Sequence, residues 1–154
     1  MHASEVPYIA VVGASQALDV DMADAEAVGR LLGAAGAVVV CGGRGGVMAA
    51  ASRGAAIAGG TVIGMLPGND RSDANEWVTV AVPTGLGELR NGLIVRTADA
   101  MVAVGGAYGT LSEVALGLQA GLRVYGLHTW DIGGIEAVAS PEEAVEKALA
   151  AARA

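Results

Sequence analysis

Short apolar runs alternate along the chain with longer segments whose apolar positions recur three and four residues apart. The runs are rich in β-branched residues and have the length of strands, whereas the longer segments have the spacing of amphipathic helices. The pattern predicts strands at Tyr8–Val12, Ala37–Cys41, Thr61–Leu66, Val78–Val82, Ala100–Val104 and Arg123–Leu127. It predicts helices at Asp21–Ala35, Gly46–Ala58 and Leu86–Thr97, one that ends at Ala120 and one that begins at Pro141.

Some of these strands are apolar at nearly every position. Ala37–Val40 and Met101–Val104 contain no polar residue and show no alternation. Such strands are typical of a parallel sheet that is covered on both faces. We therefore predict an α/β fold, namely a Rossmann-like, doubly wound and mostly parallel sheet with helices on both faces, in a single domain of residues 1–154.

The last helix has an unusually clear start. Ser140 suits the N-cap, Pro141 suits the first helical position, and Glu143 completes a capping box with Ser140. We expect the helix to begin at this point.

The chain is acidic and has few cations. Its formal net charge is −7, with nine Lys and Arg residues against sixteen Asp and Glu residues. Polyanion binding depends on clustered cations, so we expect no nucleic-acid partner, and the apolar runs are too short for a membrane helix. With Cys41 as its one cysteine and no secretory segment, the chain is predicted to be cytoplasmic and without an intrachain disulfide.

Residue counts exclude several kinds of chemistry. The one lysine, Lys147, lies in a predicted surface helix, so a buried Schiff-base lysine is excluded. No glycine loop is followed by Lys and then Ser or Thr, as a P-loop requires. The two histidines and one cysteine make no metal-ligand spacing, so we expect no metal site and no required cofactor.

Four loops that follow predicted strands are candidates for a ligand site, and two of them contain adjacent glycines. Ligands of open parallel sheets bind outside the carboxyl ends of the strands, where glycine allows close backbone approach and helix N-termini attract anions. The loops are Gly13–Ser15, Gly42–Gly46, Pro67–Asp70 and Gly105–Thr110. From them we predict binding of a phosphorylated small molecule by Gly13, Ser15, Gly42, Gly43, Arg44, Gly45, Gly46, Gly105, Gly106, Ala107, Tyr108, Gly109 and Thr110. The alternative is that the glycines serve only tight turns and packing, and the absence of a GxGxxG order argues against NAD.

Three side chains in or beside these loops have two interpretations each. Arg44 either faces a bound anion or is a solvated loop residue. Glu113 either completes a capping box with Thr110 as N-cap, which the spacing favours, or projects near a bound phosphate and acts on water or on a sugar cation. His128, beside Trp130, is expected to serve loop packing rather than ligand contact.

Several segments together resemble the LOG family, once called lysine decarboxylases. Leu89–Asn91, Asp99–Met101 and Gly105–Glu113 are similar to its Arg-Lys pair, its Asp-Ala strand and its P-G-G-x-G-T-x-x-E loop, and Cys41–Met48 and Gly59–Gly64 match its other glycine-rich blocks. The resemblance covers roughly residues 8–127 and is nearest to a short branch that includes molybdenum-cofactor carrier proteins.

The resemblance implies hydrolysis of the N-glycosidic bond of a nucleoside 5′-monophosphate to base and ribose 5-phosphate. It assigns catalysis to Arg90 and Glu113 and phosphate binding to the loop that includes Gly106, Gly109 and Thr110, and it implies a homo-oligomer, either a dimer or a tetramer.

The chain also departs from the LOG motif. Gly105 stands in place of the proline, Ala107 in place of the second glycine, and Asn91 in place of the lysine after the arginine. These departures favour the alternative of a binding or carrier protein for a nucleotide or a molybdopterin-type ligand, without hydrolysis.

Overall fold

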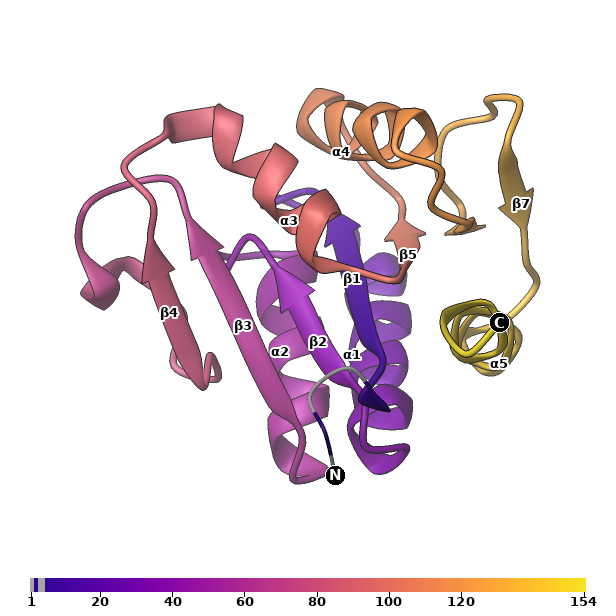
Figure 1. Ribbon diagram of the computed structural model, residues 1–154, viewed down its shortest axis with the longest axis horizontal. Coiled ribbons are helices and arrows are strands. Elements are labelled where there is room, and N and C mark those ends of the chain that lie inside the picture. Colours follow the sequence, from indigo (N-terminus) through magenta and orange to yellow (C-terminus); the bar gives the residue numbers. More distant parts are fainter. Residues whose placement is uncertain (1, 3–4) are drawn as a thin grey trace.

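The computed structural model describes residues 2 and 5–154, and within them seven strands form one sheet. The strands lie in the order β4-β3-β2-β1-β5-β6-β7, which Figure 1 shows from β4 on the left to β7 on the right. Their bounds are β1 Tyr8–Gly13, β2 Val38–Cys41, β3 Thr61–Leu66, β4 Val80–Pro83, β5 Ala100–Val104, β6 Val124–Leu127 and β7 Ile135–Ala137. Every pairing between neighbours is parallel, so the predicted doubly wound α/β fold is confirmed.

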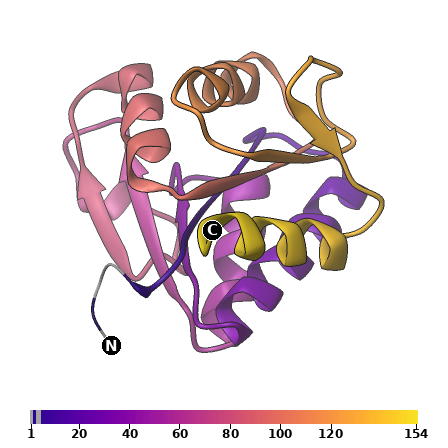
Figure 2. The ribbon, with the colours of Figure 1, turned by 45° about the vertical axis from the view of Figure 1, so that its right-hand side comes forward.

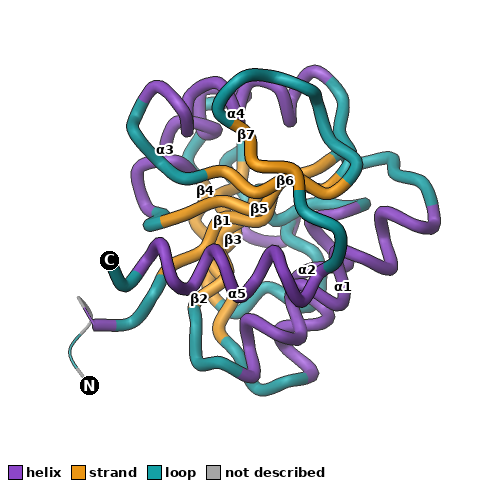
Figure 3. The backbone as a smooth tube through the Cα atoms, turned by 90° about the vertical axis from the view of Figure 1, so that its right-hand side faces the viewer, coloured by secondary structure: helices purple, strands orange, loops and turns teal. Residues whose placement is uncertain are grey.

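The helices form two layers, one on each face of this sheet (Figure 3). Their bounds are α1 Asp19–Ala34, α2 Val47–Ile57, α3 Asn91–Thr97, α4 Tyr108–Gln119 and α5 Pro141–Ala152. Helices α1, α2 and α5 pack on one face, and α5 lies across the same side of the sheet as α1 (Figure 2). Helices α3 and α4 cover the other face.

Strand β1 lies at the centre of the core, and this position explains why its residues are apolar on both faces. Ile9 and Val11 belong to the buried cluster under α1, α2 and α5, whereas Ala10 and Val12 belong to the cluster under α3 and α4. Successive side chains of a strand point to opposite faces, and here both faces are covered. A polar residue at any of these positions would lose its hydration.

Helices α1 and α2 approach each other closely enough for backbone to touch backbone. A Cβ added at Gly29 would lie 2.0 Å from the carbonyl oxygen of Ala51, and one at Gly54 would lie 2.1 Å from that of Glu26. Glycine is required at both positions because no side chain fits, and the close packing holds the two helices in register under the sheet.

The strand order reverses at β1, and this reversal sets the place of a ligand site. The chain builds β1 to β4 outward in one direction and then crosses to β5, which pairs with the other side of β1. The loops after β1 and β5 lead to helices on opposite faces, so a crevice opens at the carboxyl edge between them.

Some elements differ from the pattern-based expectations. The helix predicted at Leu86–Thr97 begins as a 3-10 helix, η3 Gly87–Arg90, before α3. Strand β7 was not expected, because it has three residues at the sheet edge and its only signal is its pairing with β6. Over the same described residues, no helix combines the length and the apolar character that a membrane crossing needs.

Candidate functional site

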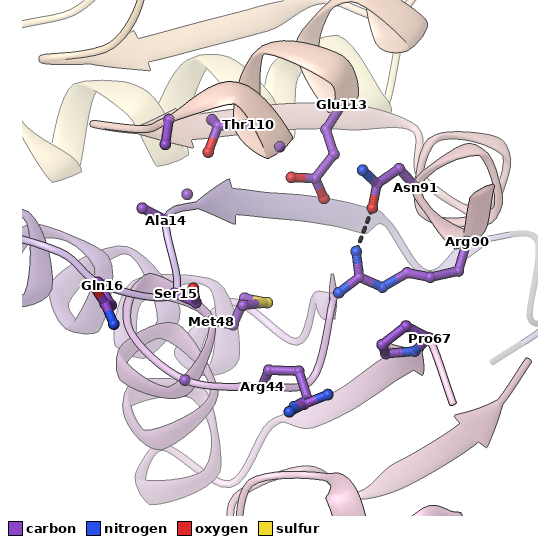
Figure 4. Close-up of a pocket in the computed structure, with 14 residues that line it drawn as sticks. Ala14, Ser15, Gln16, Arg44, Met48, Pro67, Arg90, Asn91, Thr110 and Glu113 are labelled. Carbon is purple, nitrogen blue, oxygen red and sulfur yellow. Dashed lines mark hydrogen bonds between the residues drawn. The ribbon is translucent and has the colours of Figure 1, made fainter. Parts of the chain in front are cut away.

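A cavity of about 640 Å³ opens at the carboxyl edge of β1, β2, β3 and β5 (Figure 4). It lies at the reversal of strand order and receives residues from each of the four loops predicted to approach a ligand. Its lining consists of Gly13, Ala14, Ser15, Gln16, Arg44, Gly45, Met48, Pro67, Arg90, Asn91, Ala107, Gly109, Thr110 and Glu113.

Helix α4 starts at the wall of this cavity without a side-chain cap. Its N-cap residue is Ala107, which has no side chain able to accept a hydrogen bond, and the first α-helical bond runs from the N–H of Leu111 to the carbonyl of Ala107. The N–H groups of the first turn, which includes Gly109 and Thr110, are therefore left without helical partners. These donors and the positive end of the helix dipole favour an anion at this position.

The hydroxyl of Thr110 is buried in the same turn. The residue is 2% exposed, and in the part of the chain that the structure describes its Oγ1 has no hydrogen-bond partner. In Figure 4 the hydroxyl points toward the cavity. The expectation that Thr110 is the N-cap is wrong, because α4 begins at Tyr108 and Thr110 already lies within its first turn.

Glu113 consequently does not cap the helix. It lies one turn further along α4, is 6% exposed, and turns its carboxyl group toward the centre of the cavity (Figure 4). Burial raises the pKa of Glu113 to about 8, and the positive charge of Arg90 offsets only part of this rise. At pH 7 the group is therefore mostly protonated and uncharged, and it can donate a hydrogen bond.

Arg90 enters the cavity from the end of η3 and is held in place by two hydrogen bonds. Its Nε donates to the carbonyl of Met65 over 2.8 Å, and its Nη1 donates to Oδ1 of the buried Asn91. Burial lowers the pKa of Arg90, yet a guanidinium keeps its proton at neutral pH. Asn91 therefore orients Arg90. At this position the LOG motif has a lysine, which would add a second cation instead.

Gly42 makes room for the same guanidinium. A Cβ at Gly42 would lie 2.7 Å from Nη2 of Arg90, so this glycine supports the cavity from behind rather than lining it.

The loop that carries Arg44 is anchored by Asn75. The side-chain amide of Asn75 donates to the carbonyl of Arg44 over 2.9 Å, and its backbone N–H donates to the carbonyl of Gly43 over 2.8 Å. At the end of the loop, Gly46 has φ +63°, and a Cβ there would lie 2.2 Å from the carbonyl oxygen of Ala14. The loops after β1 and β2 are therefore packed together, and the exposed side chain of Arg44 lines the cavity.

Six of the residues predicted to bind phosphate do not line this cavity. Gly42, Gly43 and Gly46 shape the loop behind it, and Gly105 and Gly106 border a second cavity. Tyr108 is 82% exposed and stacks on Trp130, with ring centroids 6.2 Å apart.

The second cavity also receives His128, whose Nε2 lies 3.8 Å from Oδ2 of Asp24. No group of three or more His, Cys, Asp or Glu side chains among residues 2 and 5–154 is arranged to hold a metal ion.

Sequence reasoning did not select five residues that line the main cavity. They are Ala14, Gln16, Met48, Pro67 and Asn91. Ala14 and Pro67 lie in two of the four candidate loops and Asn91 stands beside Arg90, so a signal was available for these three. Nothing in the pattern around Gln16 or Met48 indicates that either side chain reaches this edge.

A family model matches residues 6–153 and is described as the SLOG cluster4 family. The chain belongs to this family. The resemblance to a short LOG-like branch that includes molybdenum-cofactor carriers is thereby confirmed. An uncharacterised protein of Archaeoglobus fulgidus is 39% identical over 138 residues, which cover 89% of this chain and 91% of that protein.

Two solved structures are similar over nearly their whole length. The molybdenum cofactor binding protein of Rippkaea orientalis superimposes with a TM-score of 0.89 and 35% identity, covering 94% of this chain and 96% of that one. The molybdenum cofactor carrier protein of Chlamydomonas reinhardtii gives a TM-score of 0.83 and 32% identity, with 94% and 99% covered. DNA processing protein A of Streptococcus pneumoniae, at 18% identity and a TM-score of 0.74, shares the fold alone.

Proposed function

We propose that this chain binds and carries a phosphorylated small molecule, either a nucleotide or a molybdopterin-type cofactor, with the phosphate at the N-terminus of α4. The observation that carries the proposal is the Thr110 hydroxyl, which is buried beside the uncapped start of the helix and has no hydrogen-bond partner among residues 2 and 5–154. A buried polar group without a hydrogen bond costs about 1–3 kcal/mol. A phosphate oxygen in the cavity would remove this cost and accept from the free N–H groups as well.

The charges around the cavity support an anionic ligand. Arg44 and Arg90 contribute two guanidinium groups to the lining, and Glu113 is mostly uncharged at pH 7 because its pKa lies near 8. The lining is therefore positive at neutral pH although the whole chain carries a net charge of −7. Guanidinium forks match the oxygens of a phosphate in geometry and charge.

The relatives support the carrier alternative over hydrolysis. Two similar proteins are described as binding or carrying the molybdenum cofactor. The cavity fits the phosphate of such a group through Thr110, the free N–H groups of α4 and the two arginines.

The protonation of Glu113 also favours binding without turnover. LOG-type hydrolysis of a nucleoside monophosphate stays a prediction of the family resemblance, and it would use Arg90 and Glu113, which do line one cavity. An ionised carboxylate is needed to activate water or to stabilise a sugar cation. At pH 7 most of the Glu113 population lacks that charge. Release of free base from AMP or GMP above a buffer blank would show that hydrolysis occurs.

A homo-oligomer, either a dimer or a tetramer, also remains a prediction. The layer of η3, α3 and α4 exposes apolar side chains, with Leu89 76% and Leu116 42% exposed, and these are surfaces that subunit association would bury. Light scattering coupled to size exclusion measures the subunit number.

The phosphate site is tested with a pair of valine substitutions. Thr110→Val keeps the shape of the side chain and removes the hydroxyl, so we expect affinity for AMP, GMP or a pterin phosphate to fall about 10-fold or more in calorimetric titrations. Thr129→Val is the matched control, because Thr129 lines neither cavity and its buried Oγ1 also lacks a partner in the described part of the chain. Equal affinities for the two variants would contradict the proposed site, and no binding of any phosphorylated probe by the unaltered protein would contradict the function.

A further inference from the structure

A second cavity of about 570 Å³ lies beside the main one. The two share Ala14, Gln16 and Ala107 in their linings, so they adjoin at these three residues. Its far side is formed by the start of α1 and by the loop Gly105–Gly106. A ligand whose phosphate lies at the start of α4 can therefore extend into this second space.

The second cavity is lined by a buried carboxylate that has no partner. Asp21 lies in the first turn of α1 and is 7% exposed, and within residues 2 and 5–154 its side chain makes no hydrogen bond or ion pair. It does not cap α1, since no side-chain cap bond is formed there. His128 lines the same cavity but faces Asp24, and no lysine or arginine of the described chain lines it. Its oxygens reach the cavity, so they accept hydrogen bonds from whatever occupies that space, either water or a ligand.

Gly105 provides the space that this carboxylate occupies. A Cβ at Gly105 would lie 2.3 Å from Oδ2 of Asp21, and the residue has φ +56°. Proline, which the LOG motif has at this position, is fixed near φ −65° and would also extend a ring toward the carboxylate. The departure from the motif at Gly105 and the burial of Asp21 are therefore two parts of one local arrangement.

We propose that Asp21 recognises the 2-amino-4-oxopyrimidine edge of the ligand, which guanine and pterins both present. This edge places a ring N–H beside an amino group, and the two oxygens of one carboxylate can accept from both. Adenine lacks this pair of donors, and a 2-oxo ring turns a carbonyl oxygen toward the carboxylate instead. The inference rests on the proposed function, because the phosphate site delivers the ring to this cavity.

The test uses two matched pairs of ligands that differ only in the 2-amino group. GMP is compared with IMP, and 6-hydroxymethylpterin phosphate with the corresponding 2-oxo compound, the lumazine phosphate, in calorimetric titrations of the unaltered protein. We expect the amino member of at least one pair to bind about 10-fold more tightly, as is typical of hydrogen bonds to a charged group. The pair that shows the preference identifies the source of the edge as a guanine nucleotide or a pterin.

Two substitutions that each remove one negative charge test which residue causes the preference for the 2-amino group. Asp21→Asn replaces one of the two acceptor oxygens by a donor, so the preference should fall to less than about 3-fold. Asp19→Asn is the control, because Asp19 lies in the same first turn of α1, is exposed and lines neither cavity. It should keep the full preference. The comparison of ligand pairs on the unaltered protein stands even if the Asp21 variant does not fold.

The outcomes separate this inference from the proposed function. If all four ligands bind and the members of each pair bind equally, the role of Asp21 is overturned while the phosphate site stands. If Asp19→Asn removes the preference as fully as Asp21→Asn does, general charge and not contact is responsible, and the role is again overturned. If none of the four binds, both proposals fail.

Discussion

Helices α4 and α5 carry the same pattern near their starts, a threonine or serine followed three residues later by glutamate, and the two glutamates have opposite environments. In α5 the pattern forms a cap, because Ser140 accepts from the N–H of Glu143 over 3.2 Å and Glu143 accepts from the N–H of Ala139 over 2.9 Å. In α4 the pattern lies inside the helix, where the Thr110 hydroxyl finds no partner among the residues that the structure describes and Glu113 is buried at a cavity.

The difference teaches that a capping pattern acts only where the chain leaves the extended conformation. Ser140 is extended, with φ −153° and ψ 158°, and is the N-cap. In α4 the extended residue is Ala107, three positions before Thr110. The backbone N–H of Ala139 and the Lys147 side chain lower the pKa of Glu143, whereas burial raises that of Glu113. One α-helical turn thus changes a stabilising cap into a candidate binding group.

The largest expected effect is on stability at alkaline pH. The pKa of Glu113 is about 8 in the folded chain against 4.5 when unfolded, so the folded state holds the extra proton between these values and stability falls as pH rises. From pH 5 to pH 9 this loss is on the order of 4 kcal/mol. Glu113→Gln should remove it, which urea denaturation at both pH values measures.

Glu143→Gln provides the opposite case. The pKa of Glu143 is lowered in the folded chain, so its contribution is present above the unfolded pKa and is lost as pH falls. This variant should keep the alkaline loss of the unaltered protein. An alkaline loss that persists unchanged in Glu113→Gln would show that the carboxyl group of Glu113 is already ionised at neutral pH.

The next effect is on ligand affinity. As pH rises through about 8, Glu113 gains a negative charge in the cavity, and we expect the affinity for a phosphorylated ligand to fall about 10-fold. The ligand phosphate is already a dianion above pH 7, so its own titration adds little. Calorimetric titrations at pH 7 and pH 9 should show the fall in the unaltered protein and in Glu143→Gln, and a level affinity in Glu113→Gln.

The smallest expected effects on stability come from removing the hydroxyl groups of Ser140 and Thr110. Ser140→Ala removes a working cap and should lower the free energy of unfolding by about 1 kcal/mol without changing ligand affinity. Thr110→Val removes a hydroxyl that has no partner, so stability should hold or rise while affinity falls. A loss of stability in Thr110→Val as large as that in Ser140→Ala would mean that Thr110 has a structural partner.

Much of the fold was predictable from local pattern. The continuous apolar strands and the helical spacing between them predict a parallel sheet covered by helices on both faces, because burial on both faces allows almost no polar residue. The start of α5 was predictable for the same local reason, since serine, proline and glutamate act there on adjacent backbone. The edge strand β7 was not, because three residues carry too little pattern.

The loops that form the candidate site were predictable from the sequence, but several of its side-chain contacts were not. Arg44, Arg90 and Glu113 do line one cavity, as the glycine loops and the family resemblance suggested. The role of Asn91 in orienting Arg90 and the position of Asp21 against Gly105 join segments far apart in sequence. The pattern of residues along the sequence does not reveal such contacts.

The amino-acid sequence by itself determined most of the strands and helices, the acidic and lysine-poor composition, and the loops able to approach a phosphate. The tertiary structure alone decided where α4 begins, and with it that Thr110 and Glu113 face a cavity rather than cap a helix. The physical reason is that hydrophobic pattern and capping act over one or two turns of chain. Burial, the pKa of Glu113 and the position of Asp21 against Gly105 depend on groups brought together from distant segments.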